Sequence, residues 1–483
     1  MNFHHRWARA QTRREFLRNC QTGLGAIALA ALGRREGRGA HPAVNPLAPR
    51  PPVFTPKVKN VIYLHMSGAP PQQELFDYKP RLVKHHMQPC PAELLQNQRF
   101  AFIKGHPQLL GTPYQFRRHG QCGAWVSELL PHFSHMVDDV AFIQSMHTDQ
   151  FNHAPAELFL YTGSPRAGSA AMGSWITYGL GSESQNLPGF VVLISGGTDP
   201  TGGKALWSTG FLPSVYQGVQ CRTTGEPILY VTNPKGMNAD VRRQSLDALK
   251  RLNEFELEQF GDPETLTRIE QYELAFRMQL AVPEVMDLRQ EPAAIQEMYG
   301  AQPGAASFAN NCLLARRLVE RGVRYVQLYD WGWDTHGTGK GDDIVHHLPN
   351  KCRQIDQPIA ALLKDLKQRG LFEETLVIWG GEFGRTSMNE ARGGSKFLGR
   401  DHHPHCFTIW LAGGGIRGGT TLGATDELGY FITDHPVSIR DLQATILHLL
   451  GLDAWKLTYS YQGLQQRLIG PEGDARVRRE ILA

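Results

Sequence analysis

The sequence has few cysteines, and their spacing suggests no shared site. Seven cysteines are scattered over 483 residues with no CxxC pair. Zinc knuckles and small disulfide frameworks need closely spaced cysteines, so neither is indicated. Long apolar runs are also scarce, and the run from Thr22 to Leu32 is too short for an ordinary transmembrane helix. We therefore expect no transmembrane domain in the mature chain.

A large surplus of basic charge is missing as well. Fifty Lys and Arg residues against 46 Asp and Glu residues give a net charge of +4, and no basic stripe is interleaved with aromatic residues. Nucleic acid is therefore not an expected partner. The composition, 41% hydrophobic and 20% charged, is that of a globular chain long enough for one large α/β domain or two smaller ones.

The amino-terminal segment predicts export. Arg13 and Arg14, within the stretch TRREFLR, precede the apolar run from Thr22 to Leu32, and this order closely resembles a twin-arginine export signal. We expect residues 1–45 to be a signal peptide read by the twin-arginine export machinery, which implies a periplasmic or secreted location. Basic residues after the apolar run leave the cleavage point, and retention as an anchor, open. Residues 46–56 are rich in proline and predict a stiff linker.

The remaining chain, residues 57–483, alternates predicted strands and helices. Short apolar runs at Val58–Leu64, Tyr325–Leu328, Leu376–Trp379 and Phe407–Leu411 are typical of buried strands in a mostly parallel sheet. Amphipathic segments between them predict crossover helices, which gives an α/β fold with helices on both faces of the sheet. A helical insertion at about residues 200–300 interrupts this rhythm and is a candidate cover for the site.

Carboxylates and imidazoles gather beside three of these strands. In open α/β sheets, chemistry collects at the strand ends, and mixed imidazole and carboxylate ligands favour zinc or manganese over calcium. A polar loop is the alternative for any single histidine. The candidate metal ligands are Asp334, His336, Glu382, Asp401, His402 and His403.

Three further candidates come from other segments. Ser67 and Asp77 follow the first strand, whose end usually lines the site in doubly wound sheets, although both residue types are also common in turns. His153 precedes Pro155 and is predicted to lie at a helix amino terminus, which favours anions. His153 is therefore a candidate nucleophile, general base or metal ligand, with a purely structural role as the alternative.

Several motifs together resemble the alkaline phosphatase and sulfatase superfamily. They are NVIYLHMSGAP, HAPAELFLYTG, GWDTHG, TLVIWGGEFGRT and GRDHHP with LAGGGIRGG. More narrowly, the chain resembles an uncharacterised secreted sulfatase-like family with twin-arginine signals. The resemblance implies a three-layer α/β/α sandwich, alkaline phosphatase-like, and divalent metal ions held by Asp and His at strand ends. It places Glu382 where a metal-binding Asp normally stands and His153 at the nucleophile position.

Departures from the sulfatase motif separate two functions. His153 replaces the usual Cys or Ser, so no formylglycine can form, and Ala156 and Glu157 replace the Ser and Arg that follow. We expect Glu157 to repel an anionic ester. One function is a metal-dependent hydrolase of a phosphate, sulfate or related ester on a small molecule or glycan. The other is a non-catalytic exported protein that keeps the fold for binding or structure.

Overall fold

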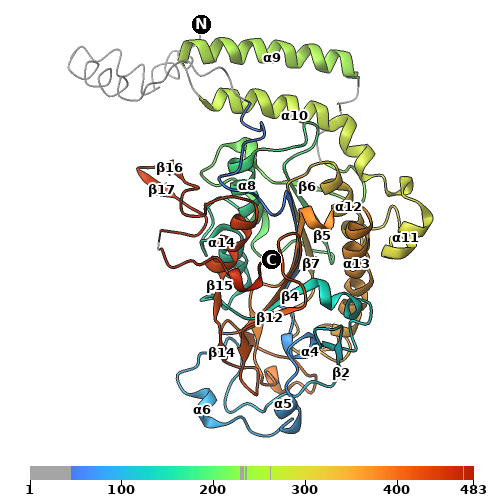
Figure 1. Cartoon of the computed structure of the whole chain (residues 1–483), viewed down its shortest axis with the longest axis vertical. Coiled ribbons are helices and arrows are strands. Elements are labelled where there is room, and N and C mark those ends of the chain that lie inside the picture. The colour runs from blue at the N-terminus through green and yellow to red at the C-terminus, as the bar shows by residue number, and fades with distance from the viewer. Residues whose placement is uncertain (1–44, 229–232, 234–235, 261–262, 472) are drawn as a thin grey trace, which may run out of the picture.

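The computed structural model describes residues 45–228, 233, 236–260, 263–471 and 473–483. The proposed twin-arginine signal therefore lies almost entirely outside the described residues. Figure 1 shows a twisted central sheet with helices on both sides, and the predicted α/β sandwich with a mostly parallel sheet is confirmed. Helices α12 (Phe308–Glu320) and α13 (Leu348–Gln368) cover one face, while α7 (His153–Thr162), α8 (Met172–Leu180) and α14 (Ile439–Leu449) cover the other.

Within the described residues, the main sheet has nine strands. In spatial order they are β12 (Thr420–Leu422), β4 (Val140–His147), β11 (Phe407–Gly413), β8 (Thr375–Gly380), β1 (Asn60–Ser67), β7 (Tyr325–Trp331), β5 (Phe190–Ser195) and β6 (Val219–Cys221), with β15 (Val437–Ser438) also paired to β4. Every residue of β1 and β8 is buried, as expected for central strands covered on both faces.

Strand β11 departs from the expected parallel arrangement, because it pairs antiparallel with both β8 and β4. The segment between β8 and β11 contains no crossover helix. It forms instead a small two-stranded sheet of β9 (Gly384–Arg385) and β10 (His402–His403). A parallel return needs a long crossover, so the chain reverses direction here. The amino end of β11 consequently lies at the same edge of the sheet as the carboxyl ends of β4 and β8.

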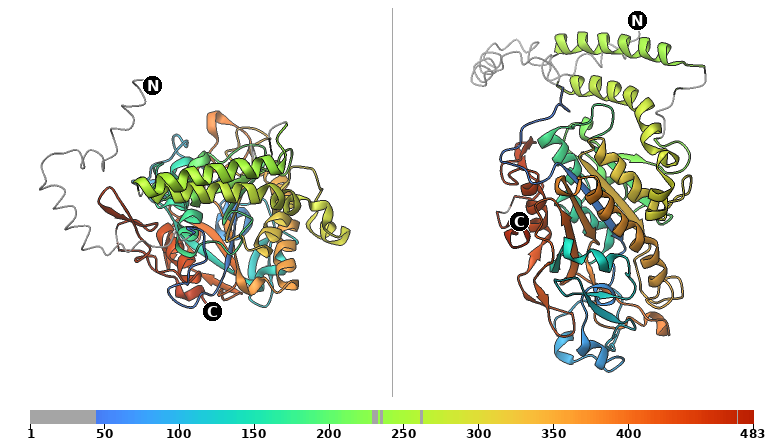
Figure 2. Two further views of the ribbon diagram at one scale, coloured as in Figure 1. Left: turned by 90° about the horizontal axis from the view of Figure 1, so that it is seen from above. Right: turned by 45° about the vertical axis from the view of Figure 1, so that its right-hand side comes forward.

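The two long helices of the predicted insertion do not cover that edge. Helices α9 (Ala239–Phe260) and α10 (Pro263–Met286) form a hairpin at one end of the molecule, far from α5 (Pro80–Lys84) and α6 (Ala92–Leu95) at the other end (Figures 1 and 2). Arg277 of α10 donates to the carbonyl of Gln185, shortly before strand β5, at 2.7 Å. The hairpin therefore packs near the amino ends of the strands, opposite their carboxyl ends.

Residues 46–56, expected to be a linker, lie against the domain. Leu47 is buried in the main hydrophobic core, and its carbonyl accepts a hydrogen bond from the Ser182 amide at 2.9 Å. The Val53 amide donates to the Gly451 carbonyl at 2.8 Å, just beyond α14.

Among the described residues, no helix combines the length and apolar character that crossing a bilayer requires.

Candidate metal centre

Three chain segments meet at the carboxyl edge of the sheet. The loop after β4 leads to His153, the first residue of α7. The loop after β7 carries Asp334 and His336, and the short strand β10 carries His402. Gly68, at the end of β1, has φ +108°, and a Cβ there would lie 2.5 Å from the Asp334 amide nitrogen. Only glycine allows the β1 and β7 ends to approach so closely.

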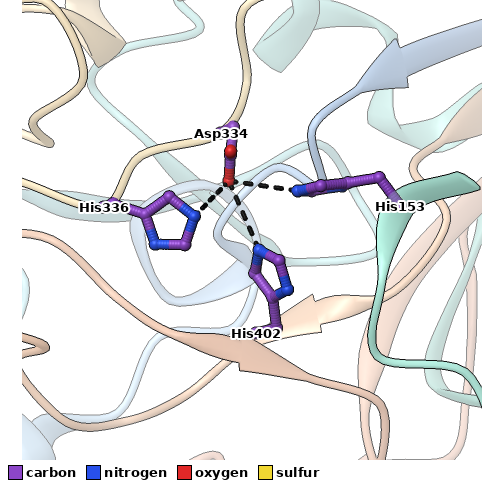
Figure 3. A group of neighbouring side chains, drawn as sticks. All are labelled: His153, Asp334, His336 and His402. Carbon is purple, nitrogen blue, oxygen red and sulfur yellow. Dashed lines mark ion pairs between the residues drawn. The ribbon is translucent and has the colours of Figure 1, made fainter. Parts of the chain in front are cut away.

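Three imidazoles converge on one carboxylate oxygen (Figure 3). The Nε2 atoms of His336, His153 and His402 lie 2.8, 3.3 and 3.5 Å from Asp334 Oδ1. Together these four side chains form a group whose ligand atoms all lie within 4.8 Å of one another. These separations are close to the spacing of ligands around one transition-metal ion with bonds of about 2 Å.

The other ring nitrogen of each histidine has an acceptor. His153 Nδ1 lies 2.5 Å from Glu382 Oε1, and His402 Nδ1 lies 2.7 Å from the Phe151 carbonyl. His336 Nδ1 bonds to Glu390. A carbonyl can only accept, so His402 Nδ1 donates, and the carboxylates favour the same tautomer in the other two rings. Metal-binding histidines usually show this arrangement, because it turns the Nε2 lone pair towards the metal.

The buried nitrogens fit a bound cation. His153 Nε2 and His402 Nε2 are buried without a hydrogen-bond partner. In neutral rings with protonated Nδ1 atoms, lone pairs would face the Asp334 oxygen across about 3 Å, which is repulsive without a cation or proton between them. Four donors of this chemistry, three imidazoles and one carboxylate, suit zinc or manganese.

Arg385 and the burial of the group set its electrostatics. Burial raises the pKa of Asp334, but the Arg385 guanidinium and the three histidines outweigh it and hold that pKa well below its usual range. Burial lowers the pKa of His402 to about 4, although the neighbouring Asp334 carboxylate raises it. For His153, burial lowers the pKa, but Asp334 and Glu382 raise it to about 9, so a proton competes with a metal ion at this ring.

A cavity of about 880 Å³ opens beside the group. Asp334 and His336 line it together with Trp331 and Lys351. The Asp334 side chain is 30% exposed, whereas the His402 side chain is 4% exposed. The opposite side is closed by aromatic rings, since Phe383 lies 4.7 Å from the His402 ring. The centre is therefore accessible from the Asp334 side.

The other predicted ligands lie around this group. Glu382 is fully buried behind His153. Asp401 Oδ2 accepts from the amides of Phe102 and Ile103 at 2.7 and 2.9 Å, and Asp401 forms a separate acidic group with His336 and Glu390. His403 Nε2 donates to the Tyr430 carbonyl at 2.6 Å and lies outside the convergent set.

The candidates near the first strand are also engaged elsewhere. Ser67 Oγ donates to Glu157 at 3.1 Å and is fully buried. Asp77 accepts from Thr425 Oγ1 at 2.5 Å and pairs with Lys79 at 2.9 Å. Glu157 is fully buried and points towards Ser67 and Gly202. The predicted repulsion between Glu157 and an anionic ester is therefore not supported.

Two supporting residues were not found from the sequence. Arg385 donates to the Asp334 carboxylate, and its Nε donates to the Ala69 carbonyl at 2.9 Å. Glu390 lies eight residues after Glu382, a spacing with no meaning of its own in a loop. The motif GGEFGRT, with an arginine three residues after the strand-end Glu382, is the sequence signal that could have indicated Arg385.

The chain belongs to the family "Protein of unknown function (DUF1501)", whose model matches residues 58–482. No curated protein matches the sequence. Among solved structures, the PsFucS1 sulfatase from Pseudoalteromonas sp. is 12% identical with a TM-score of 0.37, covering 95% of this chain and 78% of that one.

Two other solved structures are similar at the same level. The phosphonate monoester hydrolase SpPMH from Silicibacter pomeroyi is 10% identical with a TM-score of 0.36, covering 88% of this chain and 76% of that chain. Alkaline phosphatase from the Antarctic bacterium TAB5 is 9% identical with a TM-score of 0.32, covering 83% of this chain and 100% of that chain. Likenesses of this size define no reaction, so the function rests on the site itself.

Proposed function

We propose that this protein is an exported metal-dependent hydrolase that acts on a phosphate, sulfate or related ester of a small molecule or glycan. The supporting observation is the convergence of three histidine Nε2 atoms on Asp334 Oδ1, with each Nδ1 held by an acceptor. His153, Asp334, His336 and His402 would hold a zinc or manganese ion. When bound, such an ion supplies Lewis-acid chemistry towards an ester.

His153 acts as a ligand in this proposal. Both of its ring nitrogens are committed, Nδ1 to Glu382 and Nε2 to the convergent group, so neither is free for attack on phosphorus or sulfur. The position of His153 at the start of α7 also directs the amino end of that helix towards the site, which favours an anionic ester.

The remaining side chains orient the ligands and exclude water. Arg385 is fully buried and holds the Asp334 carboxylate from the side of β9. Phe383 is buried and packs against the His402 ring, with its centroid 4.7 Å away, and closes the inner side of the centre, while the exposed Phe102 ring lies 5.4 Å from His402. The ester would approach from the cavity, where Asp334 and His336 are lining residues. A water-poor inner wall strengthens the electrostatic interactions at the centre.

A non-catalytic role is the second candidate. Four protein ligands can fill a tetrahedral site, which is typical of structural zinc, whereas catalytic zinc keeps a position open. The cavity beside Asp334 and His336 favours the hydrolase, because it gives a further ligand access to the centre.

Turnover by the purified mature protein tests the proposal. Aryl phosphate and aryl sulfate esters would be screened with wild type, with Asp334→Asn and with the surface control His86→Ala. We expect metal-dependent turnover in wild type and control, with a loss of at least about 100-fold in Asp334→Asn, as for removal of a group essential to transition-state stabilisation. Equal turnover in Asp334→Asn would refute the proposal, and bound metal without turnover on any ester would favour the structural role.

A further inference from the structure

A second cluster of ionisable side chains lies behind the proposed metal centre. His65, Glu157 and Glu382 are fully buried. His65 Nε2 lies 3.3 Å from Glu382 Oε2 and 3.6 Å from Glu157 Oε1. The three residues come from β1, α7 and the end of β8, so the cluster ties together three elements that support the centre.

The His65 ring is held rigidly. It packs edge-on against Tyr161 and Tyr329, with ring centroids 5.3 Å away in both cases. Glu157 is fixed on its other side by the Gly202 amide at 2.6 Å and by Ser67 at 3.1 Å. Because the His65 ring is buried and held between these two aromatic rings, it gives Glu382 a fixed electrostatic partner rather than a mobile one.

Glu382 connects this cluster to the metal centre. Its Oε1 accepts hydrogen bonds from the Gly68 amide at 3.0 Å and from His153 Nδ1 at 2.5 Å. Its Oε2 faces His65. Oε1 is thus held by two donors, Oε2 lies within ion-pair distance of His65, and Glu382 is absent from the group that converges on Asp334 Oδ1.

We propose that Glu382, fixed between His65 and Gly68, is a positioning residue that holds the His153 ring with Nε2 facing the metal centre. This inference rests on the proposed function, because positioning matters only if His153 binds the ion. A carboxylate behind a metal-binding histidine fixes the tautomer and orientation of the ring and raises its basicity, and its loss typically costs 10–100-fold in metal affinity.

The experiment compares Glu382→Gln and Glu382→Ala with the surface control Glu374→Gln. The glutamine oxygen can still accept from His153 Nδ1 and Gly68, whereas alanine cannot. For each variant, zinc affinity would be measured by chelator competition, bound ions per chain by elemental analysis, and ligand geometry by the absorption spectrum of the cobalt form. The tautomer of His153 would be read from imidazole ¹⁵N shifts in metal-free protein above pH 9, because burial lowers the pKa of His153 but Asp334 and Glu382 raise it to about 9, and only the neutral ring has a tautomer.

We expect Glu382→Gln to keep one ion per chain, the wild-type cobalt spectrum and an Nδ1-protonated His153. Glu382→Ala should lose 10–100-fold in zinc affinity and its tautomer preference. A changed cobalt spectrum or a lost ion in Glu382→Gln would show that Glu382 is a ligand and overturn the inference. Wild-type affinity and tautomer in folded Glu382→Ala would also overturn it.

The tautomer measurement separates this inference from the proposed function. If wild type binds no metal but Glu382→Ala loses the Nδ1-protonated form, the proposed function fails, while Glu382 is still shown to orient the His153 ring. If Glu382→Ala does not fold, Glu157→Gln supplies the second comparison. The Glu157 carboxylate pairs with Ser67, Gly202 and His65 rather than with His153. We therefore expect the His153 tautomer to stay unchanged in Glu157→Gln, and a shift as large as expected for Glu382→Ala would overturn the assignment to Glu382.

Discussion

Acid should destabilise the protein partly through His403, whose ring is stacked on Tyr430 with centroids 4.2 Å apart. Burial lowers the pKa of His403 to about 3, from an ordinary value of 6.5. Between these values the unfolded chain binds a proton that the folded chain does not. The stability contribution is therefore complete above pH 6.5 and is lost as the pH falls towards 3.

The expected loss of stability at pH 5 follows from the difference between pH 5 and the ordinary histidine pKa of 6.5. That difference is about 1.5 units, and at about 1.4 kcal/mol per unit His403 should remove about 2 kcal/mol of stability between pH 7 and pH 5. The comparison variant is His403→Gln, because its amide can still donate to the Tyr430 carbonyl and does not titrate. Chelator-stripped protein would be unfolded in urea at both pH values and followed by tryptophan fluorescence. An equal acid loss in wild type and variant would refute the reasoning.

Three further predictions follow from the export signal and the metal centre. Replacing Arg13 and Arg14 with lysine should stop a fused reporter from crossing by the twin-arginine route, and continued export by that route would contradict the signal assignment. Gly399→Ala should lower the free energy of unfolding by about 1–3 kcal/mol and weaken metal binding, because its Cβ would lie 2.0 Å from the His336 carbonyl carbon. The control is Gly339→Ala, where the Cβ would meet open space. Equal melting temperatures of the two variants would refute the expectation. His153→Ala should stay folded by circular dichroism but lose metal and turnover together, and unchanged metal content and turnover would make His153 structural.

The sequence predicted the four strands at the centre of the sheet, because these strands are mostly apolar. The run Leu376–Trp379 lies inside β8 and could be read directly from burial on both faces. The direction of β11 could not be read in the same way, because a buried strand has the same composition whether it pairs parallel or antiparallel. The decisive feature was the connection before it, which contains β9 and β10 instead of a crossover helix.

Part of the metal centre could be predicted, because residues that follow neighbouring strands meet at one edge of the sheet. Asp334, His336 and His402 were identified by this rule, and the structure brings them together with His153. The rule could not separate His402 from its neighbour His403, because adjacent residues of a short strand point to opposite sides. His402 faces Asp334, while His403 bonds to Tyr430.

Supporting contacts were beyond sequence reasoning for a different reason. Glu382 was predicted as a ligand because it follows a strand, yet its oxygens contact His65, Gly68 and His153. Whether a carboxylate at a strand end faces the ion or the histidine behind it depends on side-chain direction over a few ångströms, and spacing along the chain does not determine that direction.

The number of metal ions bound per chain tests the central claim most directly. Purified mature protein would be loaded with zinc or manganese, freed of excess ion and analysed for metal, alongside the double variant His402→Ala with Asp334→Ala and the exposed control His86→Ala. Both mutated groups belong to the convergent set, so we predict bound metal in wild type and control and none in the folded double variant. Full metal content in that variant, or no metal in wild type, would contradict the proposed metal centre.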